Sequence, residues 1–331
     1  MRLAFRPALV SLVTLVLVTA CAPAAPAAAP SVARQSVSLA YADDPSRVAL
    51  LWAITNHKVT SPLIDVTVSF LPLAQIIPAA STKQFDAIEA TPLAVPRTAG
   101  REPGFLILSA GLVNLNGTFL VTGKASAFRT PADLAGKTIA VPSLGGTFVQ
   151  ETRYVLSKKY GLDVDLRTGN VKFVETPPEA VAKLLADGKL DAAVLTQLGA
   201  FRLKDSPDVR VLSEITREAQ ALTAKRWASS LVVTYKDRVA SKGAALAELQ
   251  RLLKASGDYL RDHRSEVLAA VAQEKHVDGA FLTWFFTAYD LRAGPLTGED
   301  QTEIVASWEA AKALGDVADL PRIDDVMFKA P

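Results

Sequence analysis

The residues best suited to chemistry form a short loop that contains Ser143, Gly145, Gly146 and Thr147 and follows an apolar run ending at Val141. Two adjacent glycines let the backbone approach a bound molecule closely, and a helix after them presents free N–H groups to an anionic or carbonyl oxygen. This loop is not a phosphate loop of the nucleotide-hydrolysing type, because no Gly-Lys-Ser/Thr follows it. We therefore expect it to bind a ligand without reacting with it.

Further polar residues stand where predicted strands end. Ligands of open α/β sheets bind outside the carboxyl ends of the parallel strands, beside helix N-termini. The candidates there are Tyr41, Asp43, Thr91 and Gln197, together with Trp227, which could stack on a planar ligand near a predicted crossing between lobes. Simpler roles also fit the pattern, with Asp44, Thr91, Thr147 and Thr176 as helix caps, Tyr41 as a packed strand residue and Trp227 as a plug of the hinge.

Acidic residues near these strand ends bear on the charge of the ligand. Asp43, Asp44 and Glu89 would repel an anion, and no arginine falls on the predicted strand ends. A neutral, zwitterionic or amine-bearing ligand is therefore an alternative to an anionic one.

Residues that could catalyse a reaction are placed elsewhere. The three histidines, His57, His263 and His276, lie on predicted helix ends away from the strand termini. The sequence has no His-x-x-Glu-His motif, no Gly-x-Ser-x-Gly motif and no cysteine placed as a nucleophile. We expect a protein that is not an enzyme and that needs no metal and no cofactor.

The single cysteine, Cys21, follows a typical export signal. Arg2 and Arg6 precede an uncharged apolar run that ends in Val18-Thr19-Ala20. The run is shorter than the roughly 20 apolar residues of a membrane-spanning helix. Because Val-Thr-Ala-Cys resembles a bacterial lipobox, we expect residues 1–20 to be a signal peptide and Cys21 to carry lipid. The alternative is an ordinary secretion signal that ends beside a cysteine.

Composition excludes several classes of partner. Two of the 36 basic residues lie in residues 1–20, so 34 remain to balance 34 acidic ones. A neutral mature chain argues against a nucleic-acid binder and against a polybasic membrane patch. The Ala/Pro-rich segment in residues 21–35 is typical of an extended tether. The remaining length, about 300 residues, favours two lobes over one small core.

From Ser36 onward, short apolar runs alternate with helical patterns. Asp44-Pro45 and Thr91-Pro92 are typical helix starts, and Gly161 and Gly188 are typical helix ends. This order predicts an α/β fold with mixed, mainly parallel sheets flanked by helices, and a helical C-terminal part from Ala240. The predicted strands include residues 37–42, 64–70, 85–90, 106–113, 118–122, 171–175, 191–196, 209–212 and 231–235.

Three segments resemble the second lobe of substrate-binding proteins of ABC transporters, in the branch that binds nitrate, sulfonates, taurine and thiamine precursors. They are Phe119-Leu-Val-Thr, the run from Thr130 through Pro142 followed by Gly145-Gly-Thr, and the run that starts at Glu179. The resemblance spans roughly residues 36–240 and implies the type II periplasmic-binding fold, with a ligand held between two lobes. Members of the family often have Gly-Ser-Thr or Gly-Ser-Ser at residues 145–147, so Gly146 lacks a hydroxyl that they have.

The resemblance further implies an extracytoplasmic solute-binding lipoprotein, anchored to the membrane by its lipid, that delivers a small polar molecule to an ABC permease and its ATPase. We expect lobe 1 in residues 36–118 and 229–331, lobe 2 in residues 119–228, crossings near residues 116–124 and 225–231, and a monomer that binds no nucleic acid. The alternatives are a sensing or partner-binding lipoprotein without transport and an enzyme of the pyrimidine-synthesis type on the same fold.

Overall fold

The computed structural model describes residues 34–331, which form one compact unit. The predicted signal peptide, Cys21 and most of the predicted tether lie outside the described residues. Within residues 34–331, no helix combines the length and the apolar character needed to cross a membrane.

The first five-stranded sheet has the order β2-β1-β3-β12-β4. Strands β1, β2 and β3 run parallel, and β12 pairs antiparallel with both β3 and β4. We call this sheet with the helices packed on it lobe 1. Its strands are β1 (Gln35–Ala42), β2 (Ile64–Leu71), β3 (Ala87–Ala90), β4 (Phe105–Ala110) and β12 (Leu231–Tyr235).

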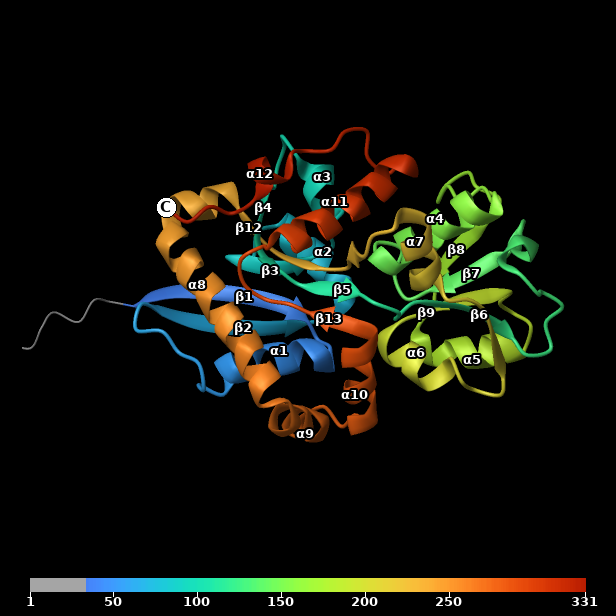
Figure 1. Cartoon of the computed structure of the whole chain (residues 1–331), viewed down its shortest axis with the longest axis horizontal. Coiled ribbons are helices and arrows are strands. Elements are labelled where there is room, and N and C mark those ends of the chain that lie inside the picture. The colour runs from blue at the N-terminus through green and yellow to red at the C-terminus, as the bar shows by residue number, and fades with distance from the viewer. Residues whose placement is uncertain (1–33) are drawn as a thin grey trace, which may run out of the picture. The chain divides into compact units, whose positions relative to one another are not determined.

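Alternating side chains bury both faces of this sheet, as expected for strands covered by helices. Leu39 on β1 packs toward α1 (Pro45–Thr55) and the long helix α8 (Lys236–Asp262), which lies beside β1 and β2 in Figure 1. Ala40 packs on the other face with α2 (Leu73–Ser81), α11 (Gly298–Ala313) and α12 (Ile323–Val326). The short helix α3 (Ala94–Thr98) follows β3, and α9 (Arg264–Glu274) and α10 (Gly279–Ala288) follow α8.

The second five-stranded sheet, in what we call lobe 2, has the order β10-β6-β9-β7-β8. Two neighbouring pairs are parallel and two are antiparallel, so both sheets are mixed as predicted, with more antiparallel pairing than expected. Helices α4 and α7 cover one face and α5 and α6 the other. The elements are β6 (Phe119–Gly123), η1 (Pro131–Leu134), β7 (Thr138–Val141), α4 (Thr147–Tyr160), β8 (Lys172–Glu175), α5 (Pro178–Ala186), β9 (Ala192–Leu195), α6 (Gln197–Leu203), β10 (Val209–Ser213) and α7 (Ile215–Thr223).

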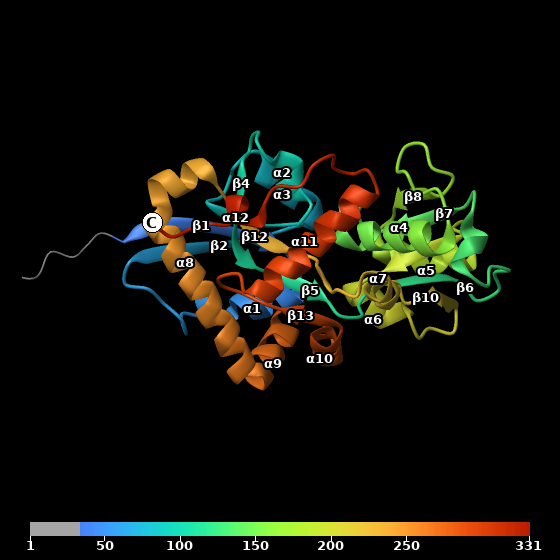
Figure 2. The same ribbon diagram turned by 45° about the horizontal axis from the view of Figure 1, so that its top comes forward.

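A small sheet of the order β11-β5-β13 lies between the two larger sheets in both ribbon views (Figures 1 and 2). Its strands are β5 (Leu112–Asn114), β11 (Trp227–Ala228) and β13 (Tyr289–Leu291). The chain passes from lobe 1 to lobe 2 at β5 and returns at β11, whereas β13 joins α10 to α11 and is a strand in the C-terminal part that the sequence predicted to be wholly helical. The boundaries expected at residues 118 and 228 match the division of strands between the large sheets, and as domain boundaries they stay a prediction.

Helix α11 packs on both lobes. Ile304 and Trp308 belong to the core of lobe 1, while Ala306 and Ala310 pack against the core of lobe 2. A buried ion pair between Arg153 of α4 and Asp316, with 2.8 Å between Nη1 and Oδ2, continues this contact beyond the end of α11. The two lobes are thus joined by a helix as well as by extended chain.

Candidate functional site

A cavity of about 850 Å³ lies between lobe 1 and lobe 2. Its lining includes the ends of β1, β3, β7 and β9 and the first residues of the helices that follow them. These are the positions at which open α/β sheets bind ligands, because each strand end there faces a helix N-terminus. Both lobes therefore contribute residues to one site.

The structure brings seven of the nine predicted ligand-binding residues to this cavity. They are Asp43, Thr91, Ser143, Gly145, Gly146, Thr147 and Gln197. Contact of these residues with a ligand stays a prediction.

Tyr41 and Trp227 lie elsewhere, and we leave both out of the proposed site. Tyr41 is 2% exposed and packs in the core of lobe 1, because its position in the alternation of β1 directs it toward α8. Trp227 is 1% exposed, its ring meets Tyr154 edge-on, and its Nε1 donates to the Thr223 hydroxyl at 3.3 Å. Trp227 thus packs at the junction of the lobes, which agrees with its alternative role as a plug of the hinge.

The loop from Ser143 to Thr147 meets lobe 1 at two points. Gly146 is the N-cap residue of α4, so Thr147 is the first helical residue rather than the cap. The Thr147 hydroxyl donates to the Ser229 carbonyl at 2.8 Å, in the segment that leads back into lobe 1. A Cβ added at Gly145 would lie 3.0 Å from Cδ1 of Ile77 on α2. Glycine therefore permits a close approach of the two lobes here.

At the lobe 1 end of the cavity, Arg47 forms an ion pair that the sequence analysis missed. Its Nε and Nη2 donate to Oε1 of Glu89 at 3.1 and 3.0 Å. Both side chains are buried, at 7% and 6% exposure. Burial opposes the charged form of Arg47, but Glu89 and Asp44 together raise its pKa. The guanidinium therefore stays charged although it lies inside the protein.

Asp44 is the N-cap of α1, as predicted, and Asp43 has its own partner. The Asp44 carboxylate accepts from the Ser46 amide at 2.9 Å and lies 3.6 Å from Nη1 of Arg47. Asp43 pairs with Lys275, the C-cap residue of α9, with 2.6 Å between Oδ1 and Nζ. The carboxylates expected to repel an anion are thus present at the cavity, each held by neighbouring groups.

At the junction of the lobes, Glu151 of α4 is buried beside the cavity-lining residues Asn114 and Thr118. Its Oε2 accepts from Asn114 Nδ2 at 2.9 Å, from Thr118 at 3.1 Å and from Thr216 at 3.4 Å. Burial raises the pKa of Glu151 to about 7, although these hydrogen bonds lower it. A carboxyl group that titrates near neutral pH therefore stands where β5 enters lobe 2.

Tyr289, on β13, is a second cavity-lining residue that sequence reasoning missed. Its hydroxyl donates to the Gly117 carbonyl at 2.9 Å, accepts from the Gln197 amide at 3.1 Å and lies 2.7 Å from the Thr196 hydroxyl. A Cβ at Gly117 would lie 2.1 Å from the Tyr289 ring, so glycine is required at this contact. Nothing local in the sequence links residues so far apart.

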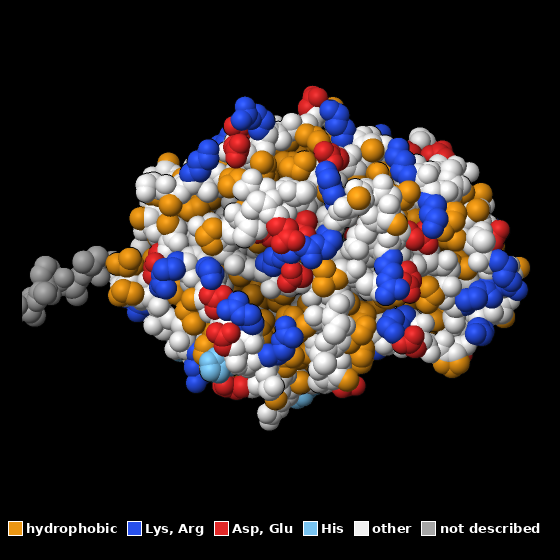
Figure 3. Space-filling model, in the orientation of Figure 1, with side chains coloured by type: hydrophobic (Ala, Val, Ile, Leu, Met, Phe, Trp, Pro, Cys, Tyr) orange, Lys and Arg blue, Asp and Glu red, His pale blue; other side chains and the backbone are white. Residues whose placement is uncertain are grey.

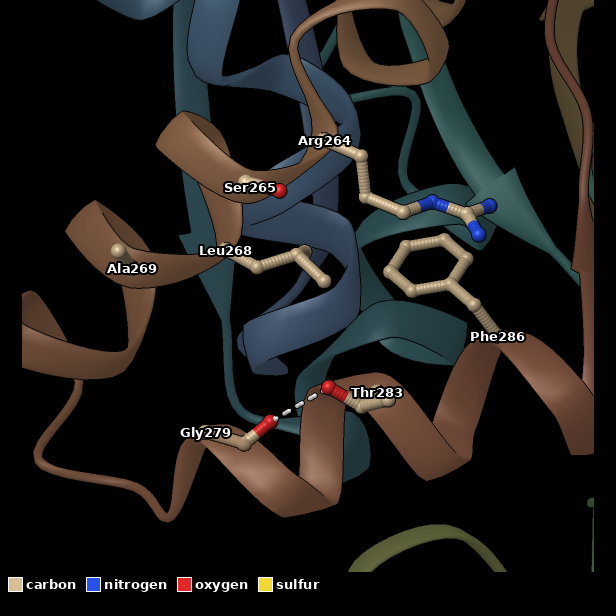
Figure 4. Close-up of a pocket in the computed structure, with 7 residues that line it drawn as sticks. All are labelled: Arg264, Ser265, Leu268, Ala269, Gly279, Thr283 and Phe286. Atoms are coloured by element: carbon tan, nitrogen blue, oxygen red, sulfur yellow. Dashed lines mark hydrogen bonds between the residues drawn. The ribbon is translucent and has the colours of Figure 1, made fainter.

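A second cavity, of about 440 Å³, opens between α9 and α10 on lobe 1 (Figure 4). The Arg264 guanidinium lies over the Phe286 ring, 4.9 Å from its centroid, and the Thr283 hydroxyl donates to the Gly279 carbonyl at 3.2 Å. All its lining residues come from these two helices. Unlike the cavity between the lobes, it therefore does not join residues from different lobes.

The face of the molecule in Figure 3 carries basic and acidic side chains interspersed, without a large field of one sign. The described histidines lie beyond the ends of helices α1, α8 and α9, and none of them lines the cavity between the lobes. Within residues 34–331, no group of three His, Cys, Asp or Glu side chains is placed to hold a metal ion.

Solved structures with the periplasmic-binding-protein fold resemble this chain over most of its length. The aliphatic sulphonate-binding protein of Escherichia coli has a TM-score of 0.67 at 13% identity, over 89% of this chain and 97% of its own. The alkanesulfonate-binding protein of Xanthomonas axonopodis pv. citri, bound to MOPS, has a TM-score of 0.63 at 18% identity, over 91% and 98%. A desulfurization enzyme shares the fold, with a TM-score of 0.59 at 15% identity, over 88% and 96%.

No curated protein matches this sequence. A family model does match, over residues 73–279 and so over more than half of the chain, and it describes a periplasmic substrate-binding protein of ABC transporters for phosphonate. This match confirms the resemblance to transporter-linked binding proteins that the sequence motifs indicated. The chain belongs to the phosphonate-type family of periplasmic substrate-binding proteins of ABC transporters.

Proposed function

We propose that this protein captures a small solute between its two lobes and delivers it to an ABC permease and its ATPase. The observation that carries the proposal is the cavity of about 850 Å³, which is lined from both lobes at the carboxyl ends of their strands. Pockets of this volume bury most of a small molecule, with a few placed polar groups to orient it. The family of the chain, which consists of solute-binding proteins, supports binding rather than catalysis.

Binding would couple to the arrangement of the lobes. A solute that touches both lobes favours the closed state over the open one, since it makes its full contacts only there. The hydrogen bond from Thr147 to Ser229 and the approach of Gly145 to Ile77 are contacts that such closure would use. The two segments that pass between the lobes, at β5 and β11, would bend, and α11 would limit the range of the motion.

We further propose that the mature protein is a monomer held outside the cytoplasm by a lipid on Cys21. The lipobox-like Val-Thr-Ala-Cys supports this, as does the Ala/Pro-rich stretch that follows. Nine residues of extended polyproline-like chain would span about 28 Å, enough to lift the binding lobes off a bilayer.

The test is transport in a defined system. Mass spectrometry of the natively purified protein would first identify the solute that accompanies it. Vesicles that contain an ABC permease and ATPase from the same host should then take up that solute only when the protein is present. Solute binding without any stimulation of uptake or ATP hydrolysis would contradict the importer and would favour a sensing role.

A further inference from the structure

At the lobe 1 end of the cavity, the groups that could donate hydrogen bonds to an anionic ligand are paired with carboxylates of the chain itself. Glu89 accepts two hydrogen bonds from Arg47, and its second carboxylate oxygen accepts from the Ala42 amide at the end of β1, at 3.1 Å. Asp44 accepts from the Ser46 amide in the first turn of α1. The donors that could bind an oxyanion at this end therefore have acceptors from the chain itself.

The charges around this end disfavour a further anion. Arg47 faces two carboxylates, Glu89 and Asp44, while Asp43 and Lys275 neutralise each other. These five side chains together carry one more negative than positive charge. They would repel an anionic ligand, and because this end of the cavity is partly buried, solvent screens the repulsion only weakly. The other cavity-lining charges, Arg97, Glu179 and Arg202, are on exposed side chains, where screening is strong.

The walls of the cavity are largely apolar. On α2, Leu73 and Ile77 are 53% and 56% exposed, although large apolar side chains are usually buried, and both line the cavity. Phe148 and Leu198 line it from lobe 2. A ligand with an apolar body would bury this apolar surface, and that burial stabilises the complex.

We propose that the ligand has an apolar body and no anionic head group, with the Glu89 carboxylate in the place that an oxyanion would occupy in lobe 1. This inference rests on the proposed solute-binding function and narrows the small polar molecule expected from the sequence. Lobe 2 keeps polar groups for orientation at the start of α4, where Ser143 and Thr147 line the cavity. Glu89 thereby determines which charge the cleft accepts.

A pair of isosteric probes tests the proposal on the full-length protein purified in detergent. p-Toluenesulfonamide and p-toluenesulfonate have nearly the same shape and differ in charge. We expect titration calorimetry to show at least tenfold tighter binding of the neutral sulfonamide, and Ala182→Trp, which fills the cavity from α5, to abolish that binding. Equal or tighter binding of the sulfonate, or no binding of either probe, would overturn the proposal.

Glu89→Ala should shift the preference toward the sulfonate. Removal of this carboxylate leaves the Arg47 guanidinium and the Ala42 amide open to a sulfonate, so sulfonate affinity should rise at least tenfold. The matched control is Asp316→Ala, which breaks another buried arginine ion pair, with Arg153, away from the cavity. This control should keep the preference of the parent.

Unchanged sulfonate affinity in folded Glu89→Ala would contradict the role of Glu89. Should this variant not fold, the probe comparison on the parent protein still decides the ligand class. The result also separates two failures. Sulfonate bound in the cavity as tightly as the sulfonamide would refute the ligand class and leave solute binding intact, whereas failure of uptake in vesicles would refute the importer alone.

Discussion

Glu151 offers a quantitative test of the junction between the lobes. Its side chain is 1% exposed, and it receives three hydrogen bonds, all from uncharged groups. Burial raises its pKa from 4.5 to about 7 in the folded protein. Between these two values the folded state holds a proton that the unfolded state has lost. The free energy of unfolding therefore falls as the pH rises from 4.5 to 7.

The size of this effect follows from the pKa shift. One pKa unit is worth about 1.36 kcal/mol, so raising the pKa from 4.5 to about 7 changes the free energy of unfolding by about 3 kcal/mol. This contribution is fully present below the unfolded pKa and is lost once the pH passes the folded pKa. Glu151→Gln keeps the shape and an acceptor oxygen but does not titrate. We expect it to be more stable than the parent at pH 8, by up to about 3 kcal/mol.

The assay is urea unfolding of both proteins at intervals from pH 5 to pH 8. The parent should lose more stability over this range than Glu151→Gln does. Glu266→Gln, at an exposed position of α9, removes a carboxylate that is not buried and should follow the parent. Parallel profiles for the parent and Glu151→Gln would refute the inference that a buried carboxyl group without a cation partner lies at this junction.

Four further outcomes are expected. Cys21→Ser should lose the lipid and leave the membrane fraction, and unchanged partitioning into membranes would contradict the anchor. Gly145→Val should abolish solute binding while the fold survives, because its Cβ would press on Ile77, and Ile77→Ala in the same chain should restore part of the affinity if that contact is the cause. Thr147→Val should weaken solute binding by about 1 kcal/mol through loss of the hydrogen bond to Ser229, with calorimetry as the measurement and unaltered affinity as the contrary result. Saturating solute should reduce the radius of gyration in X-ray scattering, whereas a constant radius would argue against closure of the lobes.

Local signals predicted most of the elements that position the site. Asp44 before Pro45 indicated the start of α1, and the Asp44 carboxylate does cap it. Gly161 indicated the end of α4, where its φ of 67° is one that glycine adopts without strain. The predicted edge strand at residues 209–212 is β10, at the edge of its sheet. In each case, the residues that determine the feature are neighbours in the sequence.

The errors came from contacts between distant residues. Residues 106–113 were predicted to form one strand, but β4 and β5 separate at Gly111 and join different sheets. A Cβ at Gly111 would lie 2.4 Å from the Ser230 carbonyl oxygen, so only glycine allows the chain to pass there. No pattern around residue 111 reveals a neighbour more than a hundred positions away.

In the candidate site, too, features set by neighbouring residues were predicted and contacts between distant residues were missed. Strand ends and the Gly-Gly pair predicted where a ligand should lie, since they depend on local turns. The partner of Arg47 on α1 is Glu89 on β3, so the ion pair could not be predicted from either segment alone. The apolar α2 wall was missed because a helical pattern does not tell whether Ile77 faces a core or a cavity.

The central claim is that a solute occupies the cavity between the lobes, and two matched substitutions test it most directly. Ala182 on α5 lines that cavity, whereas Ala269 on α9 lines the cavity between α9 and α10. Each variant replaces a helical alanine with tryptophan, so both add the same volume. Native mass spectrometry of the purified proteins should show one bound solute in the parent and in Ala269→Trp and none in Ala182→Trp. Solute retained by Ala182→Trp and lost from Ala269→Trp would contradict the account.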